Sequence, residues 1–333
     1  MFPILESARY LSKPEQPLGG KAVWKYLLRS AVHFRGSQRW ASFLLEDGAR
    51  RQMLRLQPRL LLKPQRPYLR KDASAEQRIR WLMDHYRWVR ETWSAEFALG
   101  LYQARCLQIA DIEVEGGAGY QLVLRPTCKF DREGELLISL ETNGLPLAVV
   151  SFSMVRNDLD WVASIGCLQG ASPELGREAV KAATADLHGL RPKQAVLLAL
   201  YAFARGYGVE RIVAVGNEDH VHMARWASRD KVVADYDGFW LEMGGEAIGD
   251  SFVLPRRMAR KSGDEIPARK RAQYRRRQTL EDGMVVQIRA ALPDCASVPV
   301  FKTRPTALNF SGQPINRTAK GPQGAYLPLR IAA

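Results

Sequence analysis

With 333 residues, the chain is long enough for one large domain or two smaller ones. Its 46% hydrophobic and 25% charged residues are typical of a globular protein, and the absence of an apolar run of about 18 residues excludes a predicted membrane span. The 49 lysines and arginines exceed the 35 acidic residues by 14, a balance that permits nucleic acid, anionic lipid or a phosphate-rich ligand as partner.

The four cysteines, Cys106, Cys128, Cys167 and Cys295, lack the spacing of a zinc site or a disulfide framework. We interpret them as buried thiols of a protein in a reducing compartment. The first residues do not have the length of uninterrupted apolar sequence expected of a signal peptide. A cytoplasmic protein is therefore expected, with peripheral contact to the inner membrane as an open alternative.

Residues 1–103 are predicted to form a basic, helical N-terminal region. Ser74 and Gln77 have the spacing of a helix N-cap and its partner, and apolar residues at helical spacing follow them. Five tryptophans lie among the arginines of this region: Trp24, Trp40, Trp81, Trp88 and Trp93. They indicate either helices packed on a sheet domain or an amphipathic surface that contacts a membrane. We favour the packed helices.

A mixed α/β domain is predicted over residues 104–255. Its first part alternates with a period of two, which predicts short strands over 107–114, 120–124, 136–140 and 147–152. Asn143-Gly144 between the last two strands is a strong hairpin signal, because both residues tolerate a positive φ. This part is expected to be a β-meander.

The stretch from Trp161 to Trp240 alternates strands with helices. Strands are expected over 161–168 and 211–216, helices over 174–187 and 194–205, and a further helix from Asn217. This order is typical of a crossover unit in a mixed or parallel sheet, whose ligands usually bind at the carboxyl ends of the strands. We therefore expect the functional site in this stretch.

After the crossover unit we predict a strand pair, 239–243 and 251–255, then a basic and partly helical extension over 256–292 and a disordered tail over 293–333. The segment 256–277 has ten basic and two acidic residues, so it supplies +8 of the net +14. No recognisable nucleic-acid-binding motif accompanies it, and specific nucleic-acid binding is not favoured. That third hypothesis predicts a steep salt dependence that truncation at Pro255 abolishes.

Several short motifs of the crossover unit resemble those of the VirK/YbjX family of Gram-negative bacteria. They are Cys167-Leu-Gln-Gly170, Glu178 to Lys181, His188-Gly-Leu-Arg-Pro-Lys193, Asn217 with His220, and Tyr236-Asp-Gly-Phe-Trp240 with Leu254-Pro255. The resemblance covers roughly residues 30–260. It implies a link to virulence, surface-protein placement and resistance to cationic antimicrobial peptides, but it names no reaction.

The order of elements is also similar to the GCN5-related acyltransferase fold. In that fold, backbone amides at a helix N-terminus hold the pyrophosphate of an acyl-coenzyme A. The basic turn 188–193 suits this role, because Gly189 admits a close backbone approach and Arg191 and Lys193 add positive charge. The chain departs from the pattern after the first strand, where Gln169, Gly170 and an inserted helix replace the usual glycine-rich loop.

Candidate catalytic residues follow the two strand ends. His188, in the basic turn, is a general base or a residue that braces the loop. Asn217 either orients the substrate or caps the next helix, and His220 would move a proton. Tyr236, flanked by Asp237, would be the acid that protonates a leaving thiolate, although such aromatic clusters are more often packed turns.

No metal site is predicted, because His220 and His222 are too close in sequence to argue for a metal on their own. No Gly-x-Ser-x-Gly elbow, Walker loop, His-Glu-x-x-His motif or dinucleotide fingerprint is present. Their absence argues against the common hydrolase, nucleotide triphosphatase, metalloprotease and dinucleotide-binding classes.

The sequence thus predicts an acyltransferase-like α/β enzyme. It would move an acyl group from acyl-coenzyme A or an acyl carrier thioester to an amine or hydroxyl of a small-molecule, peptide or lipid acceptor. Gln169, Gly170, Gly189, Arg191 and Lys193 would bind the donor. The alternative is a non-enzymatic virulence or antimicrobial-peptide-resistance factor that contacts an anionic membrane surface.

Overall fold

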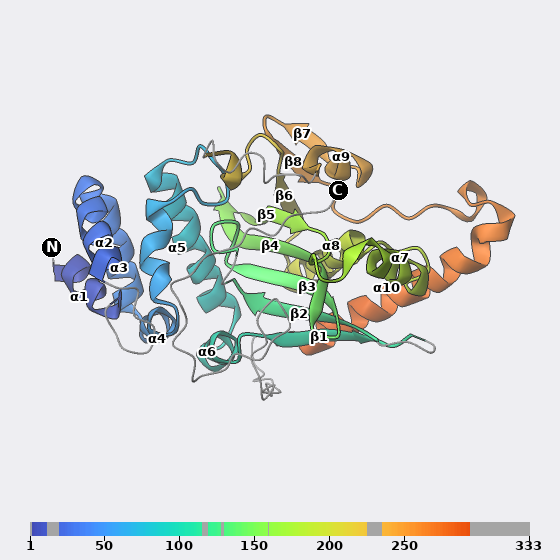
Figure 1. Cartoon of the computed structure of the whole chain (residues 1–333), viewed down its shortest axis with the longest axis horizontal. Coiled ribbons are helices and arrows are strands. Elements are labelled where there is room, and N and C mark those ends of the chain that lie inside the picture. Colours follow the sequence, from blue (N-terminus) through green and yellow to red (C-terminus); the bar gives the residue numbers. More distant parts are fainter. Residues whose placement is uncertain are drawn as a thin grey trace.

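The computed structural model describes residues 2–11, 20–114, 119–127, 130–158, 160–224 and 235–293. It confirms the predicted α/β class: a helical N-terminal region precedes a mixed sheet with crossover helices (Figure 1). None of the helices in these ranges is both long enough and apolar enough to cross a bilayer. The predicted tail lies almost wholly outside the described residues.

The N-terminal region is helical as predicted. Its elements are α1 (Phe2–Leu11), α2 (Gly20–Val32), α3 (Phe34–Glu46), α4 (Gly48–Leu56), the 3-10 helix η1 (Pro58–Gln65), α5 (Ala75–Thr92) and α6 (Ala95–Ala104). Ser74 is the N-cap of α5, and its hydroxyl accepts the amide hydrogen of Gln77 at 3.1 Å. α5 packs on β4 and lies between α1–α4 and the sheet in Figure 1.

Most of the N-terminal tryptophans belong to the core. Trp40, Trp88 and Trp93 are buried, and Trp81 is partly buried against the hydrophobic core. Trp24 is different, because 68% of its surface is exposed. The packed-helix interpretation is therefore confirmed for four of the five tryptophans and is wrong for Trp24. One continuous set of buried residues extends from α1 across the sheet to α10, so the N-terminal helices and the sheet share a core.

The described strands form one sheet in the order β1-β2-β3-β4-β5-β6-β8-β7. They are β1 (Leu107–Ile112), β2 (Tyr120–Pro126), β3 (Leu136–Thr142), β4 (Leu145–Asn157), β5 (Asp160–Gln169), β6 (Arg211–Val215), β7 (Glu246–Ile248) and β8 (Ser251–Leu254). Asn143 and Gly144 turn the β3–β4 hairpin with φ of 50° and 78°, as predicted. Among these strands only β5 and β6 pair in parallel.

The crossover from β5 to β6 contains α7 (Gly176–Asp186) and α8 (Pro192–Gly206). α8 packs on β3, β4 and β5, and α10 (Arg271–Ala291) packs on α8 and β1. Phe152 of β4 meets Phe203 of α8 with ring centroids 5.3 Å apart. The crossover unit therefore lies where the sequence predicted it, with its helices on the face of the sheet that carries Phe152.

Two local predictions after β6 are wrong. The predicted strand 239–243 is part of the helix α9 (Tyr236–Glu242), because the Asp235 carboxylate caps that helix and the Trp240 indole donates to the Val215 carbonyl at 2.9 Å. Asn217 does not begin a helix. It lies in a turn that leads to the 3-10 helix η2 (Val221–Ala224), since its side chain is used in contacts with α9.

The basic extension is partly helical, as predicted. It contains the short 3-10 helices η4 (Gly263–Glu265) and η5 (Ala268–Lys270) and the long helix α10, which begins at Arg271. Met284 and Ile288 of α10 are buried on the sheet side of the helix. The extension is therefore part of the packed structure.

Candidate functional site

The parallel strands β5 and β6 separate at their carboxyl ends. Their pairing runs from Val162 opposite Arg211 to Ile165 opposite Ala214. Gly166 is the extra residue of a β-bulge, after which β5 continues to Gln169 paired with β4. In the described part of the chain, the end of β5 thus has no ladder partner on the side of β6.

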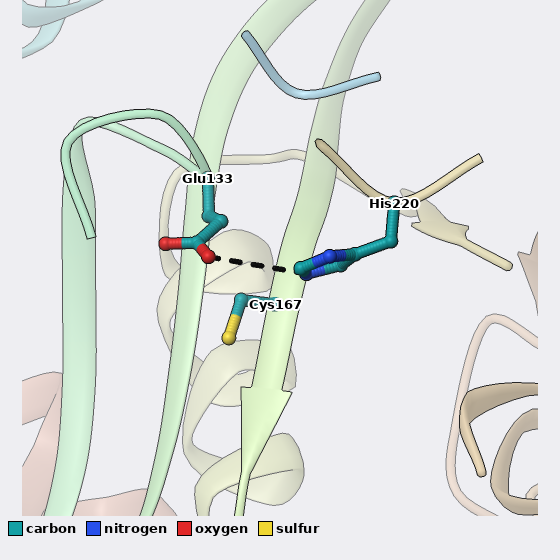
Figure 2. Close-up of side chains that lie close together, drawn as sticks. All are labelled: Glu133, Cys167 and His220. Carbon is teal, nitrogen blue, oxygen red and sulfur yellow. Dashed lines mark ion pairs between the residues drawn. The ribbon is translucent and has the colours of Figure 1, made fainter. Parts of the chain in front are cut away.

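Three buried side chains of different chemistry meet at this separation: Glu133, Cys167 and His220 (Figure 2). Glu133 comes from the turn between β2 and β3, Cys167 from β5 and His220 from the loop after β6. Their exposed fractions are 3%, 0% and 1%. One ligand atom of each lies within 4.8 Å of the others, and His220 Nε2 is 3.9 Å from Glu133 Oε1. We call this set the buried cluster.

Gly166 allows the turn that carries Glu133 to lie directly on β5. A Cβ at this position would lie 2.8 Å from the Glu133 carbonyl carbon and closer still to the carbonyl oxygen. Both groups are backbone, so neither can move aside cheaply. The glycine is therefore required for the approach that places Glu133 beside Cys167.

A segment of the N-terminal region ties the two loops of the buried cluster together. The Leu69 amide donates to the Arg132 carbonyl and the Lys71 amide to the Asp219 carbonyl, each at 2.8 Å. Arg70 also forms an ion pair with the buried Asp219 carboxylate. These contacts hold the neighbours of Glu133 and His220 in place.

Hydrogen bonds define the protonation of the two histidines. Arg132 can only donate, so His222 accepts its hydrogen at Nδ1 (3.0 Å) and donates from Nε2 to Glu133 Oε1 at 2.9 Å. The His222 amide in turn donates to His220 Nδ1 at 3.3 Å. A neutral His220 therefore carries its hydrogen on Nε2, a buried atom without a hydrogen-bond partner.

Tyr236 closes the buried cluster from the side of α9. Its ring stacks on His220 with centroids 5.2 Å apart, and its hydroxyl points to Cys167 Sγ at 3.7 Å. The Leu168 amide hydrogen-bonds to the same hydroxyl. Tyr236 thus fills the space that β6 leaves beside β5.

Burial keeps Cys167, Tyr236 and His220 uncharged. It raises the pKa of the Cys167 thiol and that of the Tyr236 phenol well above their usual values. It also lowers the pKa of His220 to about 4, against the opposing effect of Glu133. At neutral pH these three residues are therefore a thiol, a phenol and a neutral imidazole.

Comparison with known proteins identifies the family. The model of a family described as "Protein of unknown function (DUF535)" matches residues 19–290. The chain belongs to this family. It is 36% identical over 269 residues to the Escherichia coli (strain K12) protein named "Uncharacterized protein YbjX", which covers 79% of this chain and 81% of that protein. The resemblance to the VirK/YbjX family is thus confirmed.

Shorter matches link this DUF535 chain to Haemophilus influenzae. Two proteins of that organism named "Uncharacterized protein" are 32% identical over 124 residues and 30% identical over 128 residues. These matches cover 37% and 38% of this chain and 42% and 43% of the relatives.

In the DUF535 chain, Asn217 and Asp237 brace the loop beside the cluster. The side-chain oxygen Oδ1 of Asn217 accepts the backbone amide hydrogen of Tyr236 at 2.8 Å, and the Asp237 carboxylate accepts the backbone amide hydrogen of Asn217 at 2.8 Å. The Asn217 side-chain amide also donates to Asp235. These contacts position Tyr236 and use most of the hydrogen-bonding groups of Asn217.

The predicted donor-binding residues divide into two groups. Gly170 lies beside Lys193, whose Cε would be 3.8 Å from a Cβ on that glycine, and the Gln169 side chain hydrogen-bonds to Cys167. Arg191 forms an ion pair with Glu242, and Lys193 lies over the Phe239 ring at 5.9 Å. This first group therefore borders the buried cluster.

The second group is Gly189 alone, and it faces elsewhere together with the catalytic candidate His188. His188 and Gly189 have φ of 54° and 90° and end α7 with hydrogen bonds to Ala185 and Thr184. The Gly189 carbonyl accepts a hydrogen bond from Arg277 of α10 at 3.3 Å. The turn of His188 and Gly189 therefore contacts α10, which favours the bracing role of His188.

Sequence reasoning missed Glu133 and assigned Cys167 no function. Cys167 is buried as expected, Cys106 is half-buried, and Cys128 and Cys295 lie outside the described residues. Glu133 belongs to the segment Asp131 to Gly134, which has only the composition of a turn. No local signal connects it with His220, because the fold alone brings the three segments together.

Proposed function

We propose that the chain transfers an acyl group from a thioester donor to an amine or hydroxyl, with the reaction at the separated ends of β5 and β6. The observation that carries this proposal is the position of Lys193 beside Gly170, which directly follows the end of β5 that carries Cys167, the contact of the Tyr236 hydroxyl. The basic start of α8, the end of β5 that has no partner on the side of β6, and the buried hydroxyl of Tyr236 are thereby adjacent.

The donor would bind along this path by its charge and its amides. Arg191 and Lys193 lie at the first turn of α8, where the helix dipole also favours an anion such as a phosphate. Burial lowers the pKa of Lys193, yet its half-buried ammonium remains a suitable phosphate contact. If the donor has an extended arm with amide groups, that arm would pair as an added strand with the end of β5 on the side of β6.

Tyr236 supplies the acid of the proposed reaction. As the acceptor attacks the thioester carbonyl, the carbon–sulfur bond breaks and the leaving sulfur takes the phenolic proton. The raised pKa of Tyr236 keeps that proton in place until it is needed. The acceptor's proton would go to the Glu133 carboxylate. His220 cannot take this proton on Nε2, the nitrogen that faces Glu133, because that nitrogen already carries a hydrogen.

Calorimetric titration of the full chain with acetyl-, long-chain acyl- and free coenzyme A, and with an acyl carrier protein, tests donor binding. We expect one thioester to bind, and Arg191→Ala with Lys193→Ala to abolish the heat. The matched control is Arg177→Ala with Lys181→Ala, which removes two exposed charges from α7. Equal binding by both double variants, or no binding of any donor to the wild type, would contradict the proposal.

A second candidate function is peripheral binding to an anionic membrane, because α2 carries an exposed apolar stripe. Trp24, Leu28 and Val32 repeat every fourth residue, and their exposed fractions are 68%, 63% and 77%. Lys21 and Lys25 beside them are exposed. Basic residues near anionic lipid contribute roughly 1 kcal/mol each, and the stripe would enter the interface.

Vesicle flotation separates this candidate from the first. We expect the chain to float with vesicles of anionic phospholipid and not to float with vesicles of zwitterionic phospholipid. The double variant Trp24→Glu with Leu28→Glu should not float with either. Val286→Glu is the control, since Val286 is 66% exposed on α10. Flotation that ignores lipid charge, or that survives the double substitution, would refute membrane binding through α2.

A further inference from the structure

We infer that Glu133, Cys167 and His220 bind a divalent transition-metal ion of the zinc class. A carboxylate oxygen, a thiolate sulfur and an imidazole nitrogen are the ligands that zinc uses in proteins. Within the described residues, this is the group of three such side chains whose ligand atoms lie close enough to share an ion. The inference goes beyond acyl transfer and does not depend on it.

The distances suit an ion after a small contraction. Ligands bonded at about 2.0–2.3 Å in a tetrahedron lie roughly 3.3–3.7 Å from one another. The corresponding atoms of the cluster lie within 4.8 Å, and the Glu133 Oε1 to His220 Nε2 distance is 3.9 Å. Binding would therefore require the three side chains to move closer to one another.

Burial provides an independent reason. The His220 side chain is only 2% exposed, and its buried Nε2 atom has no hydrogen-bond partner. Buried polar atoms without partners are rare and costly. An ion between Nε2 and Oε1 would give the nitrogen a partner and would neutralise the Glu133 carboxylate.

Binding requires two proton changes. Cys167 must lose its thiol proton to the solvent, and the hydrogen of His220 must move from Nε2 to Nδ1. The long 3.3 Å hydrogen bond from the His222 amide to Nδ1 then opens. Because the thiol proton is released, the affinity falls as the pH is lowered.

His222 and Arg132 act as outer partners of the proposed ligands. His222 donates to Glu133 at 2.9 Å and is itself held by Arg132 at 3.0 Å. The oxygen that accepts this hydrogen bond, Oε1, is also the one nearest His220 Nε2, and its second lone pair can bind the ion while the hydrogen bond is kept. Three protein ligands leave a fourth position for water or an acceptor hydroxyl, whose proton the ion would help to release. While the ion is bound, it would replace Glu133 as the group that helps to remove the acceptor's proton.

Cobalt is the probe for the test, because a thiolate bound to Co²⁺ produces a charge-transfer band in the near ultraviolet. Full-length chain freed of metal by a chelator is titrated with CoCl2. We expect one Co²⁺ per chain with this band, loss of the band in Cys167→Ser and retention in Cys106→Ser. His222→Gln should keep the band and weaken binding about 10–100-fold. Zn²⁺ should displace Co²⁺ and raise the midpoint of thermal unfolding.

The inference is overturned if the wild type shows no band, or if Cys167→Ser binds Co²⁺ with the same band. Far-ultraviolet circular dichroism shows whether each variant is folded. Should Cys167→Ser fail to fold, Glu133→Gln serves instead, since it keeps the size of the side chain and removes its charge. Unchanged Co²⁺ affinity in folded Glu133→Gln would also refute the site.

Discussion

The buried ion pair between Lys63 and Glu135 allows a sharp test of how the N-terminal region is joined to the sheet. Lys63 Nζ lies 2.5 Å from Glu135 Oε1, and the two side chains are 3% and 1% exposed. The Tyr86 hydroxyl donates to the other carboxylate oxygen at 2.6 Å. Lys63→Met would leave the carboxylate buried beside the hydroxyls of Tyr86 and Tyr68 and without a counter-charge.

Breaking such a pair costs about 3–5 kcal/mol, a large part of the roughly 5–15 kcal/mol that stabilises a typical domain. We expect this loss for Lys63→Met in urea unfolding at pH 7, followed by tryptophan fluorescence. Lys63→Met with Glu135→Gln should recover most of it, because the amide is neutral and still accepts the Tyr86 hydrogen bond.

An exposed ion pair serves as the control. Arg256 lies 3.1 Å from Glu210, and their side chains are 83% and 61% exposed. Arg256→Met should change the free energy of unfolding by less than about 0.5 kcal/mol. The reasoning fails if Lys63→Met costs less than about 1 kcal/mol, or if the double variant is no more stable than the single one.

Three further predictions concern glycines and pH. Gly166→Ala should cost about 1–3 kcal/mol in urea unfolding, because the new methyl group meets the Glu133 backbone; a loss within error of zero would refute that contact. Gly283→Ala, with open space at its Cβ in α10, should instead stabilise by about 0.5–1 kcal/mol, and a loss would count against an unstrained helix there. Burial lowers the pKa of His85 to about 3, so the unfolded state takes up the proton first, and stability should fall as the pH decreases from about 6.5 towards 3. His85→Gln should reduce this slope in unfolding curves measured at a series of pH values; an unchanged slope would exclude His85 as a source.

The regular elements with strong local signals could be predicted from the sequence. Asn143-Gly144 predicted its hairpin, and the Ser74 cap predicted the start of α5. The segment 239–243 could not be predicted in this way. Its aromatic residues favour a strand, but tertiary contacts of Trp240 and the cap by Asp235 make it helical.

The candidate site was predicted in part. The carboxyl ends of β5 and β6 were expected to carry it, and His220 and Tyr236 do lie there. Glu133 could not be found, because its proximity depends on the bulge at Gly166 and on the fold of the turn above it. The roles assigned to these residues remain predictions.

The parallel pairing of β5 and β6 also bears on the order in which the chain folds. Neighbouring hairpins from β1 to β5 close over short separations, whereas β6 can dock only after α7 and α8 have been made. A nascent chain that ends before residue 211 therefore has Glu133 and Cys167 but lacks their histidine. During synthesis, the thiol of this half-formed centre is expected to be open to oxidants until the last strands are added.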